Sequence, residues 1–279
     1  MTSPLLTWPE ACPPETLRAE TEAMAAAWVE VLRGRFGDAL TAVYFKGSAR
    51  KPWDSPIDYV PSLSDVDLHV RLASDADIEA LDDLDAALDL AATALRAYRA
   101  HVPNPLHVPK PQLNLLNVLE RDPLYAPSPP ETVATLHGPS YEAHPLDEEA
   151  RRSYRELDRA GLVRHVEFVQ DLPMRVLDRP GALLLRIVDE LNWRISPIAP
   201  RVLSMLGTPF EEAWSMNRTR LVATLEERGH ADLAHAYAGY YRAGWRLFLE
   251  GFESGAAIEA VRRGVDALTQ GARLAEEHA

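Results

Sequence analysis

Hydrophobic and polar positions in the N-terminal half follow helical spacing in some segments and extended spacing in others. Apolar side chains recur every three or four residues over 14–36, which predicts a helix with one buried face. The apolar run at 42–45 predicts a buried strand, and the alternating segment 65–70 predicts a strand with one polar and one apolar face. A second helix is expected from residue 74 to about residue 100, and a third strand over 111–120.

The rest of the chain divides into a proline-rich stretch and a helical region. Residues 123–146 contain six prolines and no stable periodicity, so a loop or linker is expected there. From residue 147 the pattern is helical, with segments near 147–160, 162–178, 181–195, 208–228, 230–250 and 255–277. Helical spacing also predicts a core position for four aromatic residues, Tyr237, Tyr241, Trp245 and Phe248. The prediction is an α+β chain, with a domain of strands and flanking helices (1–122), a linker (123–146) and an all-α helical bundle (147–279).

Composition and charge narrow the classes of partner and compartment. No apolar run approaches the roughly 20 residues of a membrane span, and the N-terminus lacks the features of a signal peptide, so no membrane association is expected. The single cysteine, Cys12, suits a reducing compartment, and a cytoplasmic location is expected. Residues 1–150 hold 24 acidic and 11 basic groups, whereas the remainder is neutral. This balance disfavours nucleic acid as a partner; it favours a cationic partner or metal ions, or it serves solubility alone.

Candidate chemistry lies around the first two predicted strands. Gly47 and Ser48 follow the apolar run and predict a small turn, which can offer backbone N–H groups and a hydroxyl to a phosphate. Asp65 and Asp67 stand at positions i and i+2 of the alternating strand, so both carboxylates share one face, about 6.6 Å apart along the strand. Two carboxylates at this spacing can bind Mg²⁺ together with substrate phosphates.

This order of features resembles the signature of the nucleotidyltransferase fold of the DNA polymerase beta superfamily. The shared pattern is an apolar strand, Gly47-Ser48, a loop, and then Asp65-Val66-Asp67-Leu68 in a second strand. The layout of the whole chain is most similar to that of the bacterial aminoglycoside nucleotidyltransferases and minimal nucleotidyltransferases, many of which add a C-terminal helical domain. Three elements that coincide in order are more specific than a lone Asp-x-Asp.

The resemblance implies a nucleotidyltransferase-like mixed sheet with flanking helices for residues 1–122, a reaction and a set of site residues. Asp65 and Asp67 would bind Mg²⁺, as one or two ions, and Gly47 and Ser48 would hold the β- and γ-phosphates of an NTP. A hydroxyl of a small molecule or protein would attack the α-phosphate and release pyrophosphate, with AMP as the first candidate for the transferred group. Arg50 and Lys51 could add positive charge against the triphosphate, or could be exposed loop cations. Aminoglycoside-like compounds are one candidate acceptor, in keeping with the acidic balance.

The loop between the two motif halves is longer than the resemblance leads us to expect. It contains Trp53 and Tyr59. These aromatic rings could stack on a base or cover the site, or they could pack the loop onto a core, which is the more common role.

A third carboxylate of this superfamily should stand on the strand predicted at 111–120. Asn114 occupies the central position, and Glu120 shares its parity about 20 Å further along a regular strand. The general base would then come from the helical region, where the candidates are Glu167, Asp171, Asp189 and Glu190. His69 lies on the face of the two aspartates and could approach the site, although a buried structural histidine is the more common outcome.

The same residues are compatible with two other functions. Loss of the third acid is also the first step toward a catalytically impaired protein that binds nucleotides or partners. An antitoxin-like transferase that modifies a partner protein is the third possibility.

Overall fold

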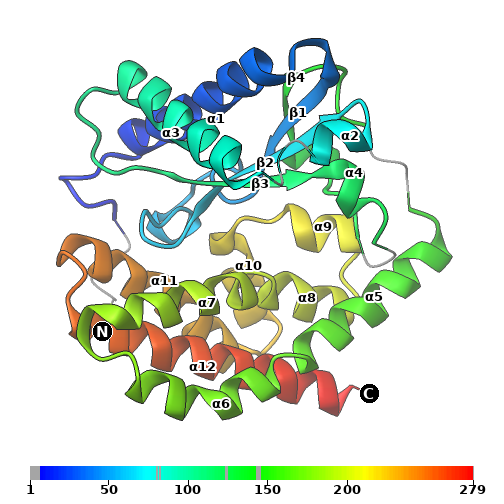
Figure 1. Cartoon of the computed structure of the whole chain (residues 1–279). Coiled ribbons are helices and arrows are strands. Elements are labelled where there is room, and N and C mark those ends of the chain that lie inside the picture. Colours follow the sequence, from blue (N-terminus) through cyan, green and yellow to red (C-terminus); the bar gives the residue numbers. More distant parts are fainter. Residues whose placement is uncertain (1–6, 80, 82, 123–124, 143–145, 279) are drawn as a thin grey trace. The chain divides into compact units, whose positions relative to one another are not determined.

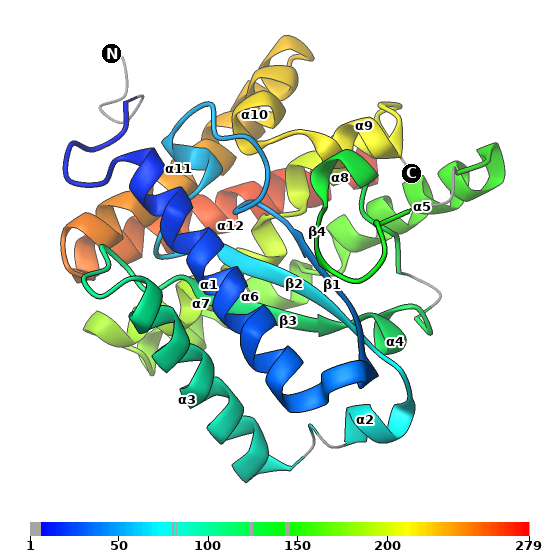
Figure 2. The same cartoon turned by 90° about the horizontal axis from the view of Figure 1, so that it is seen from above.

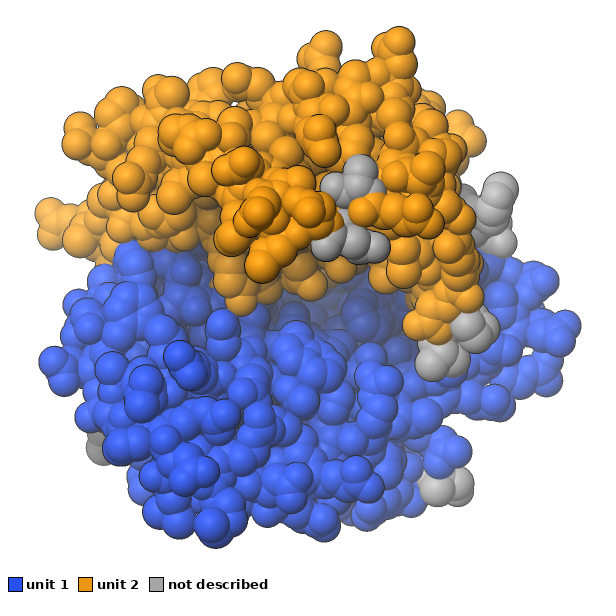
Figure 3. All heavy atoms as spheres, viewed as in Figure 1, with its two compact units in different colours: residues 1–7, 52–63, 144–279 blue, residues 8–51, 64–143 orange. Residues whose placement is uncertain are grey.

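The computed structural model describes residues 7–79, 81, 83–122, 125–142 and 146–278 (Figure 1). The protein is α+β, with one four-stranded mixed sheet, and its described residues form two compact units, coloured separately in Figure 3. Among the described residues, the sheet unit comprises 8–51 and 64–142, and the helical unit comprises 7, 52–63 and 146–278. Among the described helices, none combines the length and apolar character that crossing a membrane requires.

The sheet has the order β3-β2-β1-β4. Its strands are β1 (Leu40–Lys46), β2 (Asp65–Leu72), β3 (Lys110–Leu115) and β4 (Ala134–His137). β1 is antiparallel to both β2 and β4, whereas β2 and β3 are parallel. The parallel pair requires a crossover, and the helix α3 (Leu84–His101) provides it.

One face of the sheet is covered by α1 (Pro14–Phe36) and α3, which lie side by side in Figure 2. The bounds of α1 confirm the sequence prediction. Prolines open the helix and Gly37, with φ +53°, ends it. Buried apolar residues belong to both layers, among them Met24 and Leu32 of α1, and Phe45 and Leu68, which are paired on β1 and β2. The core of the unit therefore lies between the helices and this face.

A buried carboxylate on α1 fixes the segment that leads into β3. Glu20 is 2% exposed, and its oxygens accept hydrogen bonds from the backbone N–H groups of Leu106 (2.6 Å) and His107 (3.2 Å). The ring nitrogen Nδ1 of His107 lies 2.5 Å from the same carboxylate. Tyr98 of α3 donates to the carbonyl oxygen of His107 at 2.9 Å. Both covering helices thus hold the chain as it enters β3.

Two elements of the sheet unit differ from the sequence prediction near the third strand. β3 ends at Leu115 and is followed by the short helix α4 (Leu116–Leu119), so the strand predicted at 111–120 is too long. The cause is a tertiary contact. The side chain of Asn117 accepts a hydrogen bond from the N–H of Leu72 (3.0 Å) and donates one to its C=O (2.9 Å). In a longer strand, the backbone of β3 would have formed these bonds. Glu120 consequently lies beyond the sheet and pairs with Arg71.

The helix predicted from residue 74 is also divided. The short helix α2 (Asp75–Glu79) is separate from α3, whose first turn is capped by the carboxylate of Asp83 through the N–H of Ala86 (2.8 Å).

The predicted linker at 123–146 contains a strand and part of a core. β4 pairs with the outer edge of β1. Because β4 has only four residues and one side of it is exposed, its sequence pattern does not reveal a strand. The segment also covers the second face of the sheet, because the ring of Tyr141 packs edge-on against Tyr44 with 5.1 Å between centroids. Ala42, Tyr44 and Leu116 form the centre of this smaller cluster.

The helical unit confirms the helical character predicted from residue 147 onward. Its helices are α5 (Glu148–Val163), α6 (Val166–Leu177), α7 (Leu185–Ile195), α8 (Ile198–Met205), α9 (Phe210–Ser215), α10 (Arg218–Glu227), α11 (Ala231–Leu249) and α12 (Ser254–Glu277). Three of the four predicted core aromatics, Tyr237, Tyr241 and Trp245, are at most 1% exposed. α8 was not expected, and the segment predicted at 208–228 is two helices that part at Met216 and Asn217.

The long loop after the Gly47-Ser48 turn belongs to the helical unit, because residues 52–63 pack into its core. The carboxylate of Asp58 accepts hydrogen bonds from the N–H (2.8 Å) and hydroxyl (2.7 Å) of Thr219. Nε1 of Trp245 donates to the carbonyl oxygen of Pro56 at 2.6 Å. Tyr59 is fully buried and stacks on Trp53, with ring centroids 4.6 Å apart. Of the two roles considered for these rings, the structure therefore supports packing onto a core.

A buried histidine gives the helical unit a specific pH dependence. His165 is 5% exposed, and its ring stands edge-on to Trp193. Burial, followed by the positive charges of Arg201, Arg164 and Arg194, lowers the pKa of His165 from 6.5 to about 4. Between pH 6.5 and pH 4 the unfolded chain therefore binds a proton at this position that the folded chain does not, and stability falls as the pH falls.

We expect this group to reduce the unfolding free energy by about 2 kcal/mol between pH 7 and pH 5, since each pKa unit corresponds to about 1.4 kcal/mol. His165→Phe keeps a ring beside Trp193 and should remove this contribution to the difference in unfolding free energy between pH 7 and pH 5. Urea unfolding at both pH values measures it, with the exposed His235→Phe as control. Equal pH 7 to pH 5 differences in His165→Phe and the unsubstituted protein would contradict the assignment.

Candidate functional site

Gly47 ends β1 and opens a tight turn. Its φ of +80° is in the left-handed region, which favours glycine. Its carbonyl oxygen accepts hydrogen bonds from the N–H groups of Arg50 (3.2 Å) and Lys51 (3.1 Å), so Ser48, Ala49 and Arg50 form a single helix-like turn. The predicted turn is thus present, with Ser48 half-buried at its start.

Arg18 of α1 forms hydrogen bonds with the backbone of this turn, a role that the sequence analysis missed. Its guanidinium donates to the carbonyl oxygens of Ala49 (3.1 Å) and Lys51 (2.9 Å). Burial lowers the pKa of Arg18; the charge of Glu22 opposes the shift and the nearby charge of Arg50 adds to it. One signal in the sequence indicated this role: Arg18 directly follows Leu17, which is on the buried face of α1. A helix side chain therefore fixes the backbone just after the Gly-Ser pair.

The two halves of the predicted motif are in contact. A β-carbon placed on Gly47 would lie 1.8 Å from Oδ2 of Asp67, far inside any real contact. The carboxylate of Asp67 thus occupies the space that any other residue at position 47 would need. Only glycine lets the turn and the second aspartate approach so closely.

The strand register places Asp65 and Asp67 on one face of β2, as the alternation predicted. Their neighbours on this face are cations: Lys46 of β1 lies opposite Asp67, and Lys110 of β3 lies beside Asp65. Nζ of Lys110 is 3.0 Å from Oδ1 of Asp65. Burial lowers the pKa of Lys46, and the charge of Asp67 opposes that shift. Each of the two aspartates therefore has a lysine beside it on this face.

The position predicted for a third carboxylate is corrected by the parallel register of β2 and β3. Gln112, rather than Asn114, is the β3 neighbour of Asp67, and Asn114 lies beside His69. β3 carries no acidic residue at all. In the described parts of the chain, no group of three or more His, Cys, Asp or Glu side chains is arranged to hold a metal ion.

His69 is 3% exposed, and its ring centroid lies 6.3 Å from that of Tyr125. Burial, and then the charge of Lys46, lowers the pKa of His69 to about 3. The ring is therefore neutral at physiological pH and packed inside the unit, which favours the structural role over a catalytic one.

The four acids considered as a base belong to α6 and α7 of the helical unit. Glu190 is paired with Arg175. The other three, Glu167, Asp171 and Asp189, are exposed. None of them stands apart from ordinary surface carboxylates.

A divalent cation fits the donors of this site in part. Asp65 and Asp67 supply the hard oxygen ligands that Mg²⁺ prefers, and substrate phosphates commonly complete such a site. The surrounding cations suit a polyphosphate: all three lysines of the chain, Lys46, Lys51 and Lys110, lie on these strands or on the turn. A polyphosphate with one bound cation is the ligand that this combination of charges favours.

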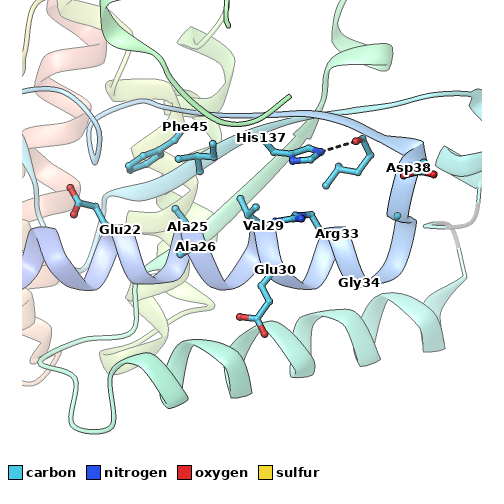
Figure 4. Close-up of a pocket in the computed structure, with 13 residues that line it drawn as sticks. Glu22, Ala25, Ala26, Val29, Glu30, Arg33, Gly34, Asp38, Phe45 and His137 are labelled. Atoms are coloured by element: carbon cyan, nitrogen blue, oxygen red, sulfur yellow. Dashed lines mark hydrogen bonds between the residues drawn. The ribbon is translucent and has the colours of Figure 1, made fainter. Parts of the chain in front are cut away.

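A hollow of about 820 Å³ lies elsewhere in the sheet unit, between α1 and the β1–β4 edge (Figure 4). Val29 and Phe45 contribute apolar surface, and Nε2 of His137 lies 3.0 Å from the carbonyl oxygen of Leu40. Its charged lining residues are Glu22, Glu30, Arg33 and Asp38. Phe45 faces away from Lys46 and Asp67 by strand alternation, so this hollow is not part of the candidate site.

No protein-family model matches this chain, and no curated protein sequence matches it.

Proposed function

We propose that the protein is a Mg²⁺-dependent nucleotidyltransferase. It transfers a nucleoside monophosphate, with AMP as the first candidate, from an NTP to a hydroxyl of a small molecule or protein, and pyrophosphate leaves. The observation that carries this proposal is the contact between the carboxylate of Asp67 and the Gly47 turn. A carboxylate that could bind a metal ion and a turn that could bind phosphates are therefore in direct contact.

The architecture adds support to the proposal. In the signature that the sequence resembles, a Gly-Ser pair follows one apolar strand and an Asp-x-Asp pair stands in the next. Here Gly47-Ser48 follows β1, and Asp65 and Asp67 begin β2, which is antiparallel to β1.

Each residue has a distinct part in this reaction. Asp65 and Asp67 would hold Mg²⁺, which when bound offsets the charge of the triphosphate and polarises it toward attack. The turn at Gly47 and Ser48 positions the β- and γ-phosphates, and Arg18 keeps the turn in place. Lys46 lies opposite Asp67, where its ammonium can stabilise negative charge on the phosphoryl group. Arg50 and Lys51, directly after the turn, add positive charge.

One structural observation favours a second candidate, a nucleotide-binding protein with little or no transferase activity. The β3 side chains that share the face of the aspartates belong to Lys110, Gln112 and Asn114, so β3 supplies no carboxylate to accept the proton of an acceptor hydroxyl. Both candidates bind NTP at the same residues, so turnover separates them.

The test is transfer of label from α-³²P-labelled ATP, GTP, CTP or UTP with Mg²⁺, with cationic polyhydroxyl compounds and proteins as acceptors. We expect label on an acceptor, an equal amount of pyrophosphate, and neither in Asp67→Asn. Release of inorganic phosphate instead would place cleavage at the γ-phosphate and contradict nucleotidyl transfer. Binding without any transfer would favour the second candidate.

A further inference from the structure

We propose that this site holds a single divalent cation and that the ammonium group of Lys110 supplies the second positive charge. The inference rests on the proposed function, because it concerns the metal content of the same site. Sites with two metal ions place the ions about 4 Å apart and share carboxylates between them. In this protein, a further carboxylate would have to come from β3, and the β3 residue beside Asp65 is Lys110.

The first argument is the position of Lys110. It is the β3 neighbour of Asp65 in the parallel register, and Nζ lies 3.0 Å from Oδ1 of that carboxylate. The Asp65 side chain is 16% exposed, whereas that of Lys110 is 51% exposed. The ammonium therefore reaches a largely buried carboxylate from the solvent side, as a bound cation would. A second metal ion at this carboxylate would be repelled by the lysine.

The second argument is the shortage of oxygen ligands on β3. Gln112 lies beside Asp67 and offers one neutral carbonyl oxygen, and Asn114 lies further along beside His69. Mg²⁺ requires near-octahedral oxygen coordination and dehydrates reluctantly. With one oxygen of Asp65 engaged by Lys110, the two aspartates are sufficient for one ion with phosphate oxygens, but not for two.

The third argument is the choice of lysine itself. The chain has 29 basic residues, and only three of them are lysines. All three stand on the strands or the turn of this site, and the lysine beside Asp65 is one of them. An ammonium is a compact point charge that can take the place of a metal ion beside a carboxylate, whereas the planar guanidinium fork is larger and pairs side by side.

The experiment counts Mn²⁺, used in place of Mg²⁺, bound per chain by EPR. The α,β-methylene analogues of ATP, GTP, CTP and UTP are added in turn, and Asp65→Ala/Asp67→Ala serves as the blank. We expect one bound Mn²⁺ in the unsubstituted protein. Lys110→Ala/Gln112→Glu removes the ammonium and adds a carboxylate beside Asp67, so we expect two. Lys110→Arg keeps the charge and should stay at one.

The outcomes distinguish the inference from the proposed function. Two Mn²⁺ ions in the unsubstituted protein would overturn the single-cation inference and leave nucleotidyl transfer standing. Mn²⁺ binding no greater than in the blank, with every analogue, would overturn the proposed function. A folded Lys110→Ala/Gln112→Glu variant that still binds one ion would overturn the role given to Lys110. If that variant unfolds, the count in the unsubstituted protein decides the inference.

Discussion

Replacing Gly47 by alanine is expected to remove measurable Mg²⁺-dependent binding of NTP and to destabilise the sheet unit by on the order of 3 kcal/mol. The backbone at φ +80° is strained for any residue with a β-carbon, and that carbon would lie 1.8 Å from Oδ2 of Asp67. The carboxylate must move away, and the turn and the metal ligand then separate. Because 1.4 kcal/mol is tenfold in affinity, losing both contacts should weaken binding by about 100-fold or more.

Gly34→Ala is the matched control for this change. Gly34 lies in α1 with an ordinary helical backbone, and a β-carbon there meets nothing within 4 Å. The substitution should leave binding unchanged and stabilise the helix by about 0.5–1 kcal/mol, since glycine is unfavourable in helices. Calorimetric titration and urea unfolding of both variants provide the comparison. Equal NTP affinities in Gly47→Ala and Gly34→Ala would contradict the contact on which the site depends.

Replacing Asp58 by alanine is expected to lower the unfolding free energy of the helical unit by about 3–5 kcal/mol. The carboxylate is 2% exposed and accepts four hydrogen bonds, from the N–H groups of Asp54 and Ser55 and from the N–H and hydroxyl of Thr219. Its loss removes the shared acceptor of these partly buried donors. It also removes the negative charge near Arg218, whose guanidinium donates to the carbonyl oxygens of Ile57 (3.0 Å) and Asp58 (3.2 Å).

Glu227→Ala is the control, because it removes an exposed carboxylate from the end of α10 in the same unit. It should change stability by less than about 0.5 kcal/mol. NTP affinity, measured where both variants are folded, should match that of the unsubstituted protein, since the contacts described for the Asp58 side chain lie inside the helical unit. A loss in Asp58→Ala no larger than that in Glu227→Ala would show that the loop is not held as described.

The elements that local signals define could be predicted from the sequence. α1 has prolines at its start, Gly37 at its end and one apolar face, and its predicted bounds were confirmed. β4 and α4 could not be predicted, because each depends on a partner distant in sequence. β4 exists by pairing with β1, and α4 replaces the end of β3 because Asn117 bonds to Leu72.

The candidate site could be predicted in its residue types but not in its contacts. Strand alternation alone places Asp65 and Asp67 on one face. The neighbour of Asp67 on β3 depends on the register of a parallel pair joined by a long crossover, and nothing local encodes whether Gln112 or Asn114 takes that place. The same holds for Arg18, whose hold on the turn spans more than thirty positions along the chain.

The loop at 52–63 illustrates the same limit. It lies between the two motif halves in sequence, which suggested a part in the site for Trp53 and Tyr59. Its contacts are instead with α10 and α11, through Thr219 and Trp245. Sequence proximity to a motif therefore did not indicate where the loop packs.

Calorimetric titration of ATP, GTP, CTP and UTP, with and without Mg²⁺, tests the central claim most directly. The protein is compared with its Asp65→Ala/Asp67→Ala variant, whose folding is verified by urea unfolding. The account predicts that at least one NTP binds, that binding requires Mg²⁺, and that the variant loses it. Failure of every NTP to bind the folded protein, or equal binding by the variant, would contradict the assignment of Asp65, Asp67 and the Gly47 turn as a nucleotide site.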